Sequence, residues 1–251
     1  MTHDGDEPAA IAAHAKEQVK RYQTVKFYNG LATKGRKTEH GFEIQIASGE
    51  RFASKKLIFA TGIRDILPDI PGIAACWGIS VLHCPYCHGY EVRNKITGIL
   101  GNGEAVFDLA RLISNWTSDL TVFTNGASTL SAGQAEQLKK HKIKIVTKEL
   151  QMLEHSNGQV KNIIFKDGTQ SAVNAIYAPV PFEQHSRIPE NLGCELGEDG
   201  YIKIDPLQET SVNGVFACGD NTSRMRTVAN AVAMGTTAGM VASKKMILEE
   251  F

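Results

Sequence analysis

The sequence predicts an α/β protein that is built in two parts. Three observations predict it. From residue 96 onward, strand-like and helix-like segments alternate, which is typical of a parallel sheet with crossover helices. A pair of glycines, Gly101 and Gly103, stands where one of these strands turns into a helix. Two further apolar strands, one before this stretch and one after it, each end at a glycine, Gly62 and Gly219.

The chain before residue 96 is predicted to be a helix followed by short strands. Capping and apolar periodicity predict a helix over residues 6–22. Strand-like runs follow at 24–28, 42–47 and 56–61, and alternation with intervening turns predicts a small antiparallel layer among them. The stretch LPDIPG at 67–72 is predicted to be a loop, because two prolines stand close together in it.

The alternating region is predicted in more detail. The expected elements are strands at 96–100, 120–124 and 142–146 and helices at 104–115 and 134–141. Residues 160–180 are then expected to form a β meander with Asp167-Gly168 as a turn. An apolar strand at 214–220 and a long helix at 229–247 complete the expected order.

The composition is that of a soluble globular protein. The chain has 251 residues, 42% hydrophobic and 22% charged, with a formal net charge of zero. A chain without net positive charge is not attracted electrostatically, as a whole, to nucleic acid or to an anionic membrane. The longest apolar run, Val228 to Met234, is too short to cross a bilayer. The amino terminus has no signal-peptide pattern, so the expected location is the cytoplasm.

The motif Gly101-Asn-Gly103-Glu-Ala-Val106 predicts a nucleotide site. At a strand-to-helix turn, the first glycine allows the tight turn and the second lets a pyrophosphate approach the backbone. The third position is a valine, so the fingerprint is incomplete. At the end of the next strand, 123–126, there is neither an acid for a ribose hydroxyl nor an arginine for a phosphate. The choice between NADH and NADPH therefore stays open.

Two strand ends predict a second ligand site. The strand GVFACGD ends in Gly219-Asp220, and an alanine- and glycine-rich helix follows it. The strand LIFATG ends in Thr61-Gly62. A buried strand with a polar end is an ordinary feature when it stands alone. Together, the two ends can bring backbone amides and one carboxylate to the polyol chain of a ligand.

The stretch HCPYCHG carries a C-x-x-C pair, Cys84 and Cys87, that has three possible chemistries. A zinc site would need four ligands. Here Cys84, Cys87, His83 and His88 are crowded within six residues, and the sequence has no second C-x-x-C. Haem attachment requires an exported chain. A redox disulfide needs only the pair, whose thiolate is the attacking species. The redox interpretation is favoured, and we expect no metal. The three other cysteines, Cys76, Cys194 and Cys218, are predicted to be buried apolar side chains.

In this order (Ala60-Thr-Gly62, Pro71-Gly72, C-x-x-C, G-x-G and a final Gly-Asp) the motifs resemble the low-molecular-weight thioredoxin reductases, which are flavoproteins of the pyridine nucleotide–disulfide oxidoreductase group. The resemblance covers nearly the whole chain. It implies two nucleotide-binding, Rossmann-like domains of three layers each. Residues 1–80 and 206–251 would form a discontinuous FAD domain. Residues 81–205 would form an inserted NAD(P) domain that carries the redox disulfide.

The resemblance also implies a reaction. Hydride would pass from NAD(P)H to FAD, and electrons would pass on to the Cys84–Cys87 disulfide. Cys87 would face the flavin, and Cys84 would attack the disulfide of a thioredoxin-like protein or a small disulfide or dithiol substrate. A homodimer is implied. The implied cofactor-binding residues are Thr61, Gly62, Gly101, Gly103, Glu104, Gly219, Asp220, Val228 and Ala229.

The sequence departs from the family pattern in three places. The family begins with a strand and a glycine-rich loop that hold the ADP half of FAD. Neither is seen in this sequence. The first domain is therefore expected to be incomplete and to bind FAD weakly. The acid that follows the redox pair is replaced by His88, as in gliotoxin-type dithiol oxidases, and an imidazole can do the same proton work. The family's arginine–glutamine pair near the flavin is replaced by Thr227-Val228. A dithiol oxidase that uses oxygen and a non-catalytic nucleotide-binding remnant are therefore alternatives.

Overall fold

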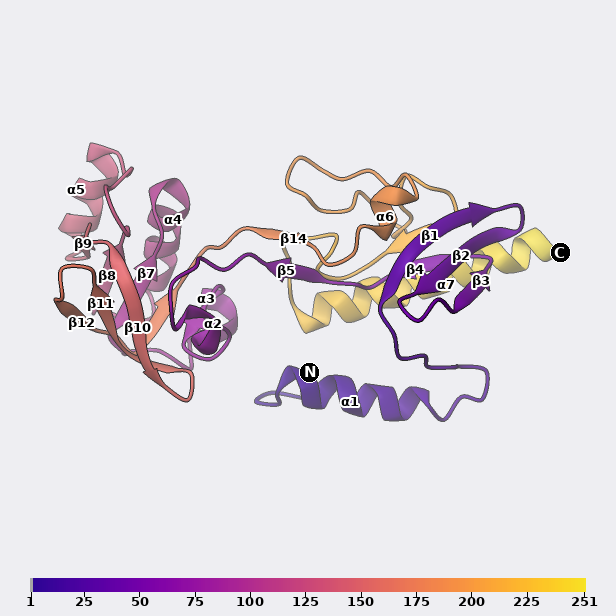
Figure 1. Cartoon of the computed structure of the whole chain (residues 1–251), viewed down its shortest axis with the longest axis horizontal. Helices are drawn as coiled ribbons and strands as arrows, with labels where there is room; N and C mark the ends of the chain where they lie inside the picture. The colour runs from indigo at the N-terminus through magenta and orange to yellow at the C-terminus, as the bar shows by residue number, and fades with distance from the viewer. Residues whose placement is uncertain (1) are drawn as a thin grey trace. The chain divides into compact units, whose positions relative to one another are not determined.

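The structure is a computed structural model that describes residues 2–251. The chain divides into two compact units. The first contains the chain up to Arg64 together with Glu183–Phe251, and the second contains Asp65–Phe182. Figure 1 shows that indigo strands from the early chain and the yellow last helix belong to the same unit. The α/β class with a parallel sheet is confirmed.

A five-stranded parallel sheet is the centre of the second unit. Its order is β6-β13-β7-β8-β9, and every pairing in it is parallel. The strands are β6 (Val81–Leu82), β7 (Thr97–Leu100), β8 (Leu120–Phe123), β9 (Lys144–Val146) and β13 (Ala175–Tyr177). The helices of this unit are α2 (Ile73–Cys76), α3 (Pro85–His88), α4 (Gly103–Ile113) and α5 (Ala132–Lys140). The predicted alternation of strands and helices is thus confirmed.

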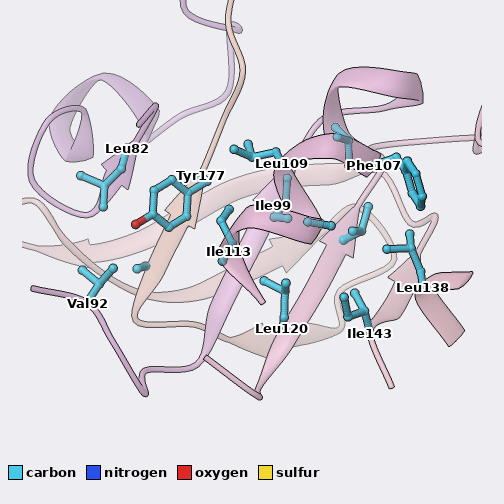
Figure 2. Close-up of a cluster of buried hydrophobic side chains, with 14 residues drawn as sticks. Leu82, Val92, Ile99, Phe107, Leu109, Ile113, Leu120, Leu138, Ile143 and Tyr177 are labelled. Carbon is cyan, nitrogen blue, oxygen red and sulfur yellow. The ribbon is translucent and has the colours of Figure 1, made fainter. Parts of the chain in front are cut away.

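Helix α4 covers the sheet with the face that its periodicity predicts. Val106, Ala110 and Ile113 are fully buried, and Leu109 is nearly so. They pack in one cluster with side chains from β6, β7, β8 and β13, as Figure 2 shows. Burial of each large apolar side chain contributes about 1.5–3 kcal/mol. This cluster therefore fixes the sheet beneath both the glycine turn and the redox pair.

The predicted meander is only partly right. β10 (Leu150–Ser156), β11 (Gln159–Phe165) and β12 (Gln170–Ala172) form an antiparallel sheet, with Asp167-Gly168 at the second turn. β13 instead returns to the parallel sheet and lies between β6 and β7. Its three residues, Ala-Ile-Tyr, are fully buried, which is the usual state of an inner parallel strand.

The first unit contains an antiparallel layer and a parallel strand pair. β1 (Ala32–Thr38), β2 (Gly41–Ile46) and β3 (Arg51–Ser54) are antiparallel, while β4 (Leu57–Phe59) pairs in parallel with β15 (Val215–Ala217). The other elements are α1 (Pro8–Val19), α6 (Ile188–Asn191) and α7 (Val228–Glu250). Where the chain passes between the units, β5 (Ile63–Asp65) pairs with β14 (Phe182–Gln184).

The prediction of a strand at 24–28 is wrong. These residues form no regular element, and the ring of Tyr28 instead lies against Phe52, 4.5 Å between centroids. The strand that pairs with β2 is the polar β1, which low β propensity hid from sequence analysis. Helix α1 is confirmed, although none of its residues is buried.

The unit boundaries differ from the expected domain boundaries, 80/81 and 205/206. Residues 65–80 belong to the second unit, because Ile73 and Cys76 pack in one cluster with Leu153 and Ile163 of the antiparallel sheet. Residues 183–205 belong to the first unit. There, side chains of α6 and the loop after it pack on Phe42 and Phe59.

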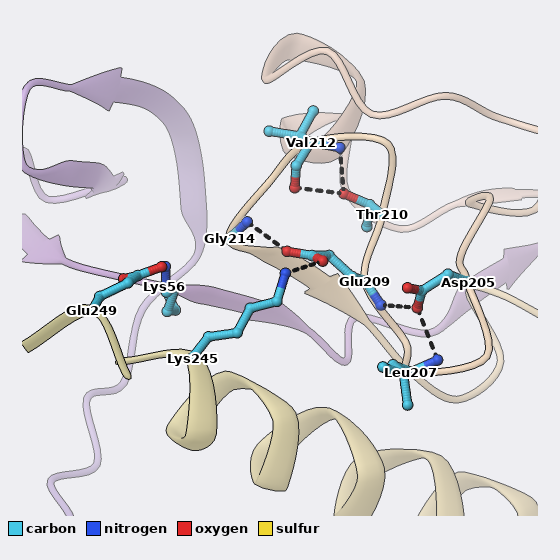
Figure 3. A network of polar contacts seen from close by, with 9 residues as sticks. All are labelled: Lys56, Asp205, Leu207, Glu209, Thr210, Val212, Gly214, Lys245 and Glu249. Carbon is cyan, nitrogen blue, oxygen red and sulfur yellow. Dashed lines mark hydrogen bonds and ion pairs between the residues drawn. The ribbon is translucent and has the colours of Figure 1, made fainter. Parts of the chain in front are cut away.

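Ion pairs hold helix α7 in the first unit, as Figure 3 shows. Lys56 Nζ donates to Glu249 at 2.6 Å, and Lys245 contacts Glu209. Glu209 also accepts from the backbone N–H of Gly214 at 2.9 Å, directly before β15. The last helix is therefore tied to the segments that precede β4 and β15.

Candidate active site

The redox pair lies at the start of a short helix directly after β6. Cys84 is the N-cap of α3, and Pro85 occupies the first helical position, where a missing N–H costs nothing. The backbone N–H of Cys87 donates to the sulfur of Cys84 at 3.3 Å, and the two sulfurs are 2.7 Å apart. No disulfide joins the two cysteines in this structure. The helix turn thus brings the two sulfurs into direct contact.

Accessibility separates this pair from the other cysteines. Cys84 is partly exposed and Cys87 is exposed, whereas Cys76, Cys194 and Cys218 are buried, as predicted. Burial raises the pKa of each of the three buried thiols. Because exchange requires an accessible sulfur that can ionise, the exposed pair is the candidate for redox chemistry.

His88 ends α3 beside the pair and contacts a carboxylate. Its Nδ1 lies 3.1 Å from a carboxylate oxygen of Glu91, and about a third of the His88 side chain is exposed. A proton on Nδ1 is donated to Glu91, which leaves Nε2 for a substrate group. Sequence analysis missed Glu91, although its spacing of three residues from His88 is the signal that could have found it.

Gly89 fixes the end of this helix against α4. A Cβ on Gly89 would lie 2.3 Å from the ring of Trp116 and 2.3 Å from the carbonyl oxygen of Pro85. Only glycine allows this approach. The residue after His88 therefore holds the redox helix against the indole that follows α4.

The glycine turn, residues 101–103, joins β7 to α4. A Cβ on Gly101 would lie 2.8 Å from Val106, so the glycine makes room for the valine at the incomplete third position of the motif. The side chain of Asn102 accepts from the N–H groups of Gly103 (3.0 Å) and Thr129 (2.8 Å). Its amide also donates to the carbonyl of Ala127 at 2.8 Å. The turn is thereby tied to the loop after β8.

A cleft of about 410 Å³ opens beside the glycine turn, a size that suits a small-molecule ligand. Its lining includes Gly101 and Asn102 with Thr124 and Asn125 at the end of β8. Thr124 donates to the Gly126 carbonyl and Asn125 accepts from the Leu150 N–H, so both side chains already have partners. Glu104 contacts Gln134 of α5. These side chains do not favour NADH over NADPH or the reverse.

In the first unit the parallel strands β4 and β15 bring two predicted segments to one sheet edge. Thr61-Gly62 follows β4, and Gly219-Asp220 follows β15. We call these residues with Asn221 the strand-end site. Ligands of α/β proteins bind at such carboxyl ends of strands. The predicted Val228 and Ala229 lie in the first turn of α7, which packs on β15, and both are exposed.

Asn221, which sequence analysis missed, connects the two strand ends. Its amide donates to the carbonyl of Phe59 at 2.9 Å and to the hydroxyl of Thr61 at 3.3 Å. The side-chain oxygen of Asn221 is buried without a hydrogen-bond partner among residues 2–251. So is that of Gln184, whose amide donates to the Asn221 carbonyl at 2.9 Å. Spare acceptors and open space at Gly62 make this edge suited to a polar ligand.

The sequence profile of the pyridine nucleotide-disulphide oxidoreductase family matches residues 2–235. The chain belongs to this family. It is 32% identical to thioredoxin reductase tcpT of Claviceps purpurea, over 98% of this chain and 80% of that protein. Thioredoxin reductase aclD of Aspergillus oryzae is 27% identical over 96% of this chain and 80% of its own length. The solved structure of a TrxB-type thioredoxin reductase from Bacillus anthracis has a TM-score of 0.94 at 26% identity, covering 100% of this chain and 85% of that one.

This membership identifies the chain as an oxidoreductase of thioredoxin reductase type, with the two-domain Rossmann-like fold of its neighbours. The family generally depends on FAD and NAD(P)H. The strand-end site fits the polar part of a flavin nucleotide, because it offers the Thr61 hydroxyl, unused acceptors and room above Gly62. Within residues 2–251, no helix has the length and apolarity needed to cross a membrane.

Proposed function

We propose that this oxidoreductase is an NAD(P)H- and FAD-dependent disulfide reductase of thioredoxin reductase type. The observation that carries the proposal is the accessible Cys84–Cys87 pair at the start of α3, in the same unit as the glycine turn. NAD(P)H would bind at the glycine turn and its cleft, with Gly101, Gly103 and Glu104. FAD would bind at the strand-end site, with Val228 and Ala229 at the start of α7. A flavin there supplies two-electron transfer between a nicotinamide and a disulfide.

The proposed exchange uses the reduced pair. The Cys84 thiolate attacks one sulfur of the substrate disulfide; a new S–S bond forms, the substrate S–S bond breaks, and His88 donates a proton to the leaving thiolate. His88, now neutral, takes the proton of Cys87; the Cys87 thiolate attacks the Cys84 sulfur, the mixed disulfide breaks, and the second leaving thiolate takes that proton from His88. The products are two substrate thiols and an oxidised pair. Pairing with Glu91 orients the His88 ring for this proton transfer.

Partners and location are part of the same proposal. The names of the relatives support a thioredoxin-like protein as the substrate, with small disulfides and dithiols as the other class. We propose a homodimer, as the resemblance implies. We propose a cytoplasmic location, because a catalytic C-x-x-C pair works where thiols are kept reduced.

Three measurements on the purified chain test the proposal. The absorption spectrum should show flavin bands at about 380 and 450 nm. Addition of NADH and NADPH in separate samples should bleach the bands with one donor faster than with the other. Mass mapping after alkylation should find Cys84 and Cys87 protected in the air-oxidised protein and labelled after reduction. Full labelling of both before reduction, with another pair protected, would overturn the assignment.

A dithiol oxidase is the second candidate, favoured by one observation. The residue after the pair is a histidine held by Glu91, as in dithiol oxidases, rather than an acid. Such an enzyme would take two electrons and two protons from a small dithiol and pass them to oxygen, giving a disulfide and hydrogen peroxide. Oxygen uptake with a small dithiol and no nicotinamide distinguishes it from a reductase, which needs NAD(P)H.

A further inference from the structure

Tyr177 is buried beneath the segment that carries the redox pair. It is the last residue of β13, and its Cα partners are Leu82 of β6 and Ile99 of β7. The backbone N–H of the next residue, Ala178, donates to the carbonyl of Leu82 at 2.8 Å. Cys84 follows Leu82 by two residues. The tyrosine is therefore fixed directly beside the point where the chain leaves the sheet for α3.

The ring belongs to the cluster shown in Figure 2, and its hydroxyl points toward Leu82 and Val92. These two residues bracket the redox segment. Tyr177 has 0% of its surface exposed, and its hydroxyl is buried without a hydrogen-bond partner among the described residues. A phenylalanine would fill the same space without leaving a buried donor unused, which costs free energy. Packing therefore explains why an aromatic ring stands at position 177, but it does not explain why the ring carries a hydroxyl.

The acidic groups that influence this hydroxyl come from the redox segment. Burial, and then the negative charges of Cys84, Glu91 and Cys87, raise the pKa of Tyr177 to about 12. This agrees with the strand register, which places Tyr177 beside Leu82, two residues before Cys84. With so high a pKa, the phenol keeps its proton at physiological pH and stays a hydrogen-bond donor.

We propose that Tyr177 is a positioning residue for the redox pair: its hydroxyl donates a hydrogen bond to the Cys84 sulfur when that sulfur is a thiolate. Reduction of the disulfide takes two electrons and one proton, breaks the S–S bond and leaves one thiolate and one thiol. In this structure no disulfide joins the pair, the Cys84 sulfur contacts the Cys87 sulfur, and the Tyr177 hydroxyl has no partner among residues 2–251. Ionisation of Cys84 gives that sulfur a further site that can accept from the hydroxyl. The hydrogen bond stabilises the reduced pair. The inference rests on the proposed redox role of this pair.

The roles of Tyr177 and His88 are then distinct. His88 is partly exposed at the end of α3 and can exchange a proton with solvent and substrate. Tyr177 is enclosed in the sheet and keeps its proton. Tyr177 shifts the equilibrium between the disulfide and the reduced pair, while His88 transfers the proton in thiol–disulfide exchange.

The test is the substitution Tyr177→Phe, with Tyr86→Phe as the matched control. Tyr86 lies between the two cysteines in sequence, and 78% of its surface is exposed. The full-length chain is equilibrated with glutathione buffers of known ratio, and the reduced fraction of the pair is read by alkylation and mass analysis. Tyr177→Phe should shift the equilibrium toward the disulfide by roughly tenfold, the effect of one hydrogen bond to a charged group. Tyr86→Phe should change it by less than about twofold.

A second readout needs no Tyr177 variant. Reduction of the native pair should shift the tyrosine absorption band to longer wavelength, and Cys84→Ser should abolish this shift. The role of Tyr177 is overturned by the following result in a chain whose native pair exchanges reversibly. The equilibrium between the reduced pair and the disulfide changes by less than about twofold in Tyr177→Phe, and the tyrosine absorption band of the native chain does not move on reduction. If no reversible Cys84–Cys87 disulfide forms even in the native chain, the proposed redox function fails first, and this inference with it.

Discussion

The two candidate nucleotide sites each contain an asparagine, and the two asparagines differ in how far their hydrogen bonds are completed. Asn102 stands in the glycine turn of the second unit, and Asn221 in the strand-end site of the first. Each ties the end of a buried strand to another part of its unit. Every polar atom of the Asn102 amide has a partner, from Gly103, Thr129 and Ala127. The oxygen of Asn221 has none among the described residues.

This difference teaches how the two sites are held. The glycine turn is stabilised by the chain itself, so its shape is set before any ligand binds. The strand-end site keeps an unused acceptor, and buried polar groups are rarely left without partners. A polar ligand at that edge would donate the hydrogen bond that the Asn221 side-chain oxygen lacks. The strand-end site should therefore depend on its cofactor more than the glycine turn does.

The largest expected effect is the loss of disulfide turnover when the redox pair of the second unit is disabled and the strand-end site of the first unit is left intact. Cys84→Ser should abolish turnover of a disulfide substrate but leave flavin reduction by NAD(P)H largely intact, because the attacking thiol is lost while the strand-end site is untouched. Stopped-flow absorbance measures the two half-reactions. Cys194→Ser is the control, since that buried sulfur lies 3.4 Å from the Thr210 hydroxyl and serine can keep the contact. Loss of both half-reactions in Cys84→Ser would point to a structural role for Cys84.

The next effect concerns proton transfer beside the pair. His88→Ala should slow disulfide turnover by roughly 10²- to 10⁴-fold, the range for a positioned acid. His40→Ala, in the exposed turn after β1, should leave turnover unchanged. A His88→Ala enzyme with nearly the native rate would make His88 a packing residue.

The strand-end site can be tested through Asn221. Asn221→Ala should lower the free energy of unfolding of the first unit by about 1–3 kcal/mol, because the carbonyl of Phe59 and the hydroxyl of Thr61 lose their donor. It should also speed the loss of flavin on dilution. Hydrogen exchange of peptides from β4 and β15 measures the first effect. Asn213→Ala, at an exposed position before β15, is the matched control. Equal flavin retention in both variants would contradict the proposed cofactor edge.

The smallest effect is expected at the glycine turn. Asn102→Ala removes the N-cap of α4 and should cost about 1 kcal/mol, seen as faster hydrogen exchange in α4 and in the loop after β8. Asn115→Ala, at an exposed position after α4, should show no such change. If Asn102→Ala destabilises the chain more than Asn221→Ala does, the comparison between the two sites is reversed.

Sequence analysis predicted the elements whose stabilising contacts are local or periodic. The apolar face of α4, the strands around it and the thiol pair are examples, because each follows from spacing within a few residues. It missed the contacts that depend on distant partners. Asn221 bonds to Phe59, 162 residues away, and Tyr177 meets the redox segment only because β13 returns to the parallel sheet. The strand expected at 24–28 failed because tertiary pairing selected the polar β1 instead.

The interleaving of the chain also sets an order of assembly during synthesis. Lys56 and Glu249 are bonded although 193 residues separate them, and β4 pairs with β15 near the other end of the described chain. The second unit is one continuous segment. On the ribosome, where domains fold as they emerge, the second unit can close around its sheet while β4 still lacks its partner strand β15. A chain that ends at residue 182 and has been released from the ribosome should therefore already protect the β7–β8 region from protease and leave β4 open to it.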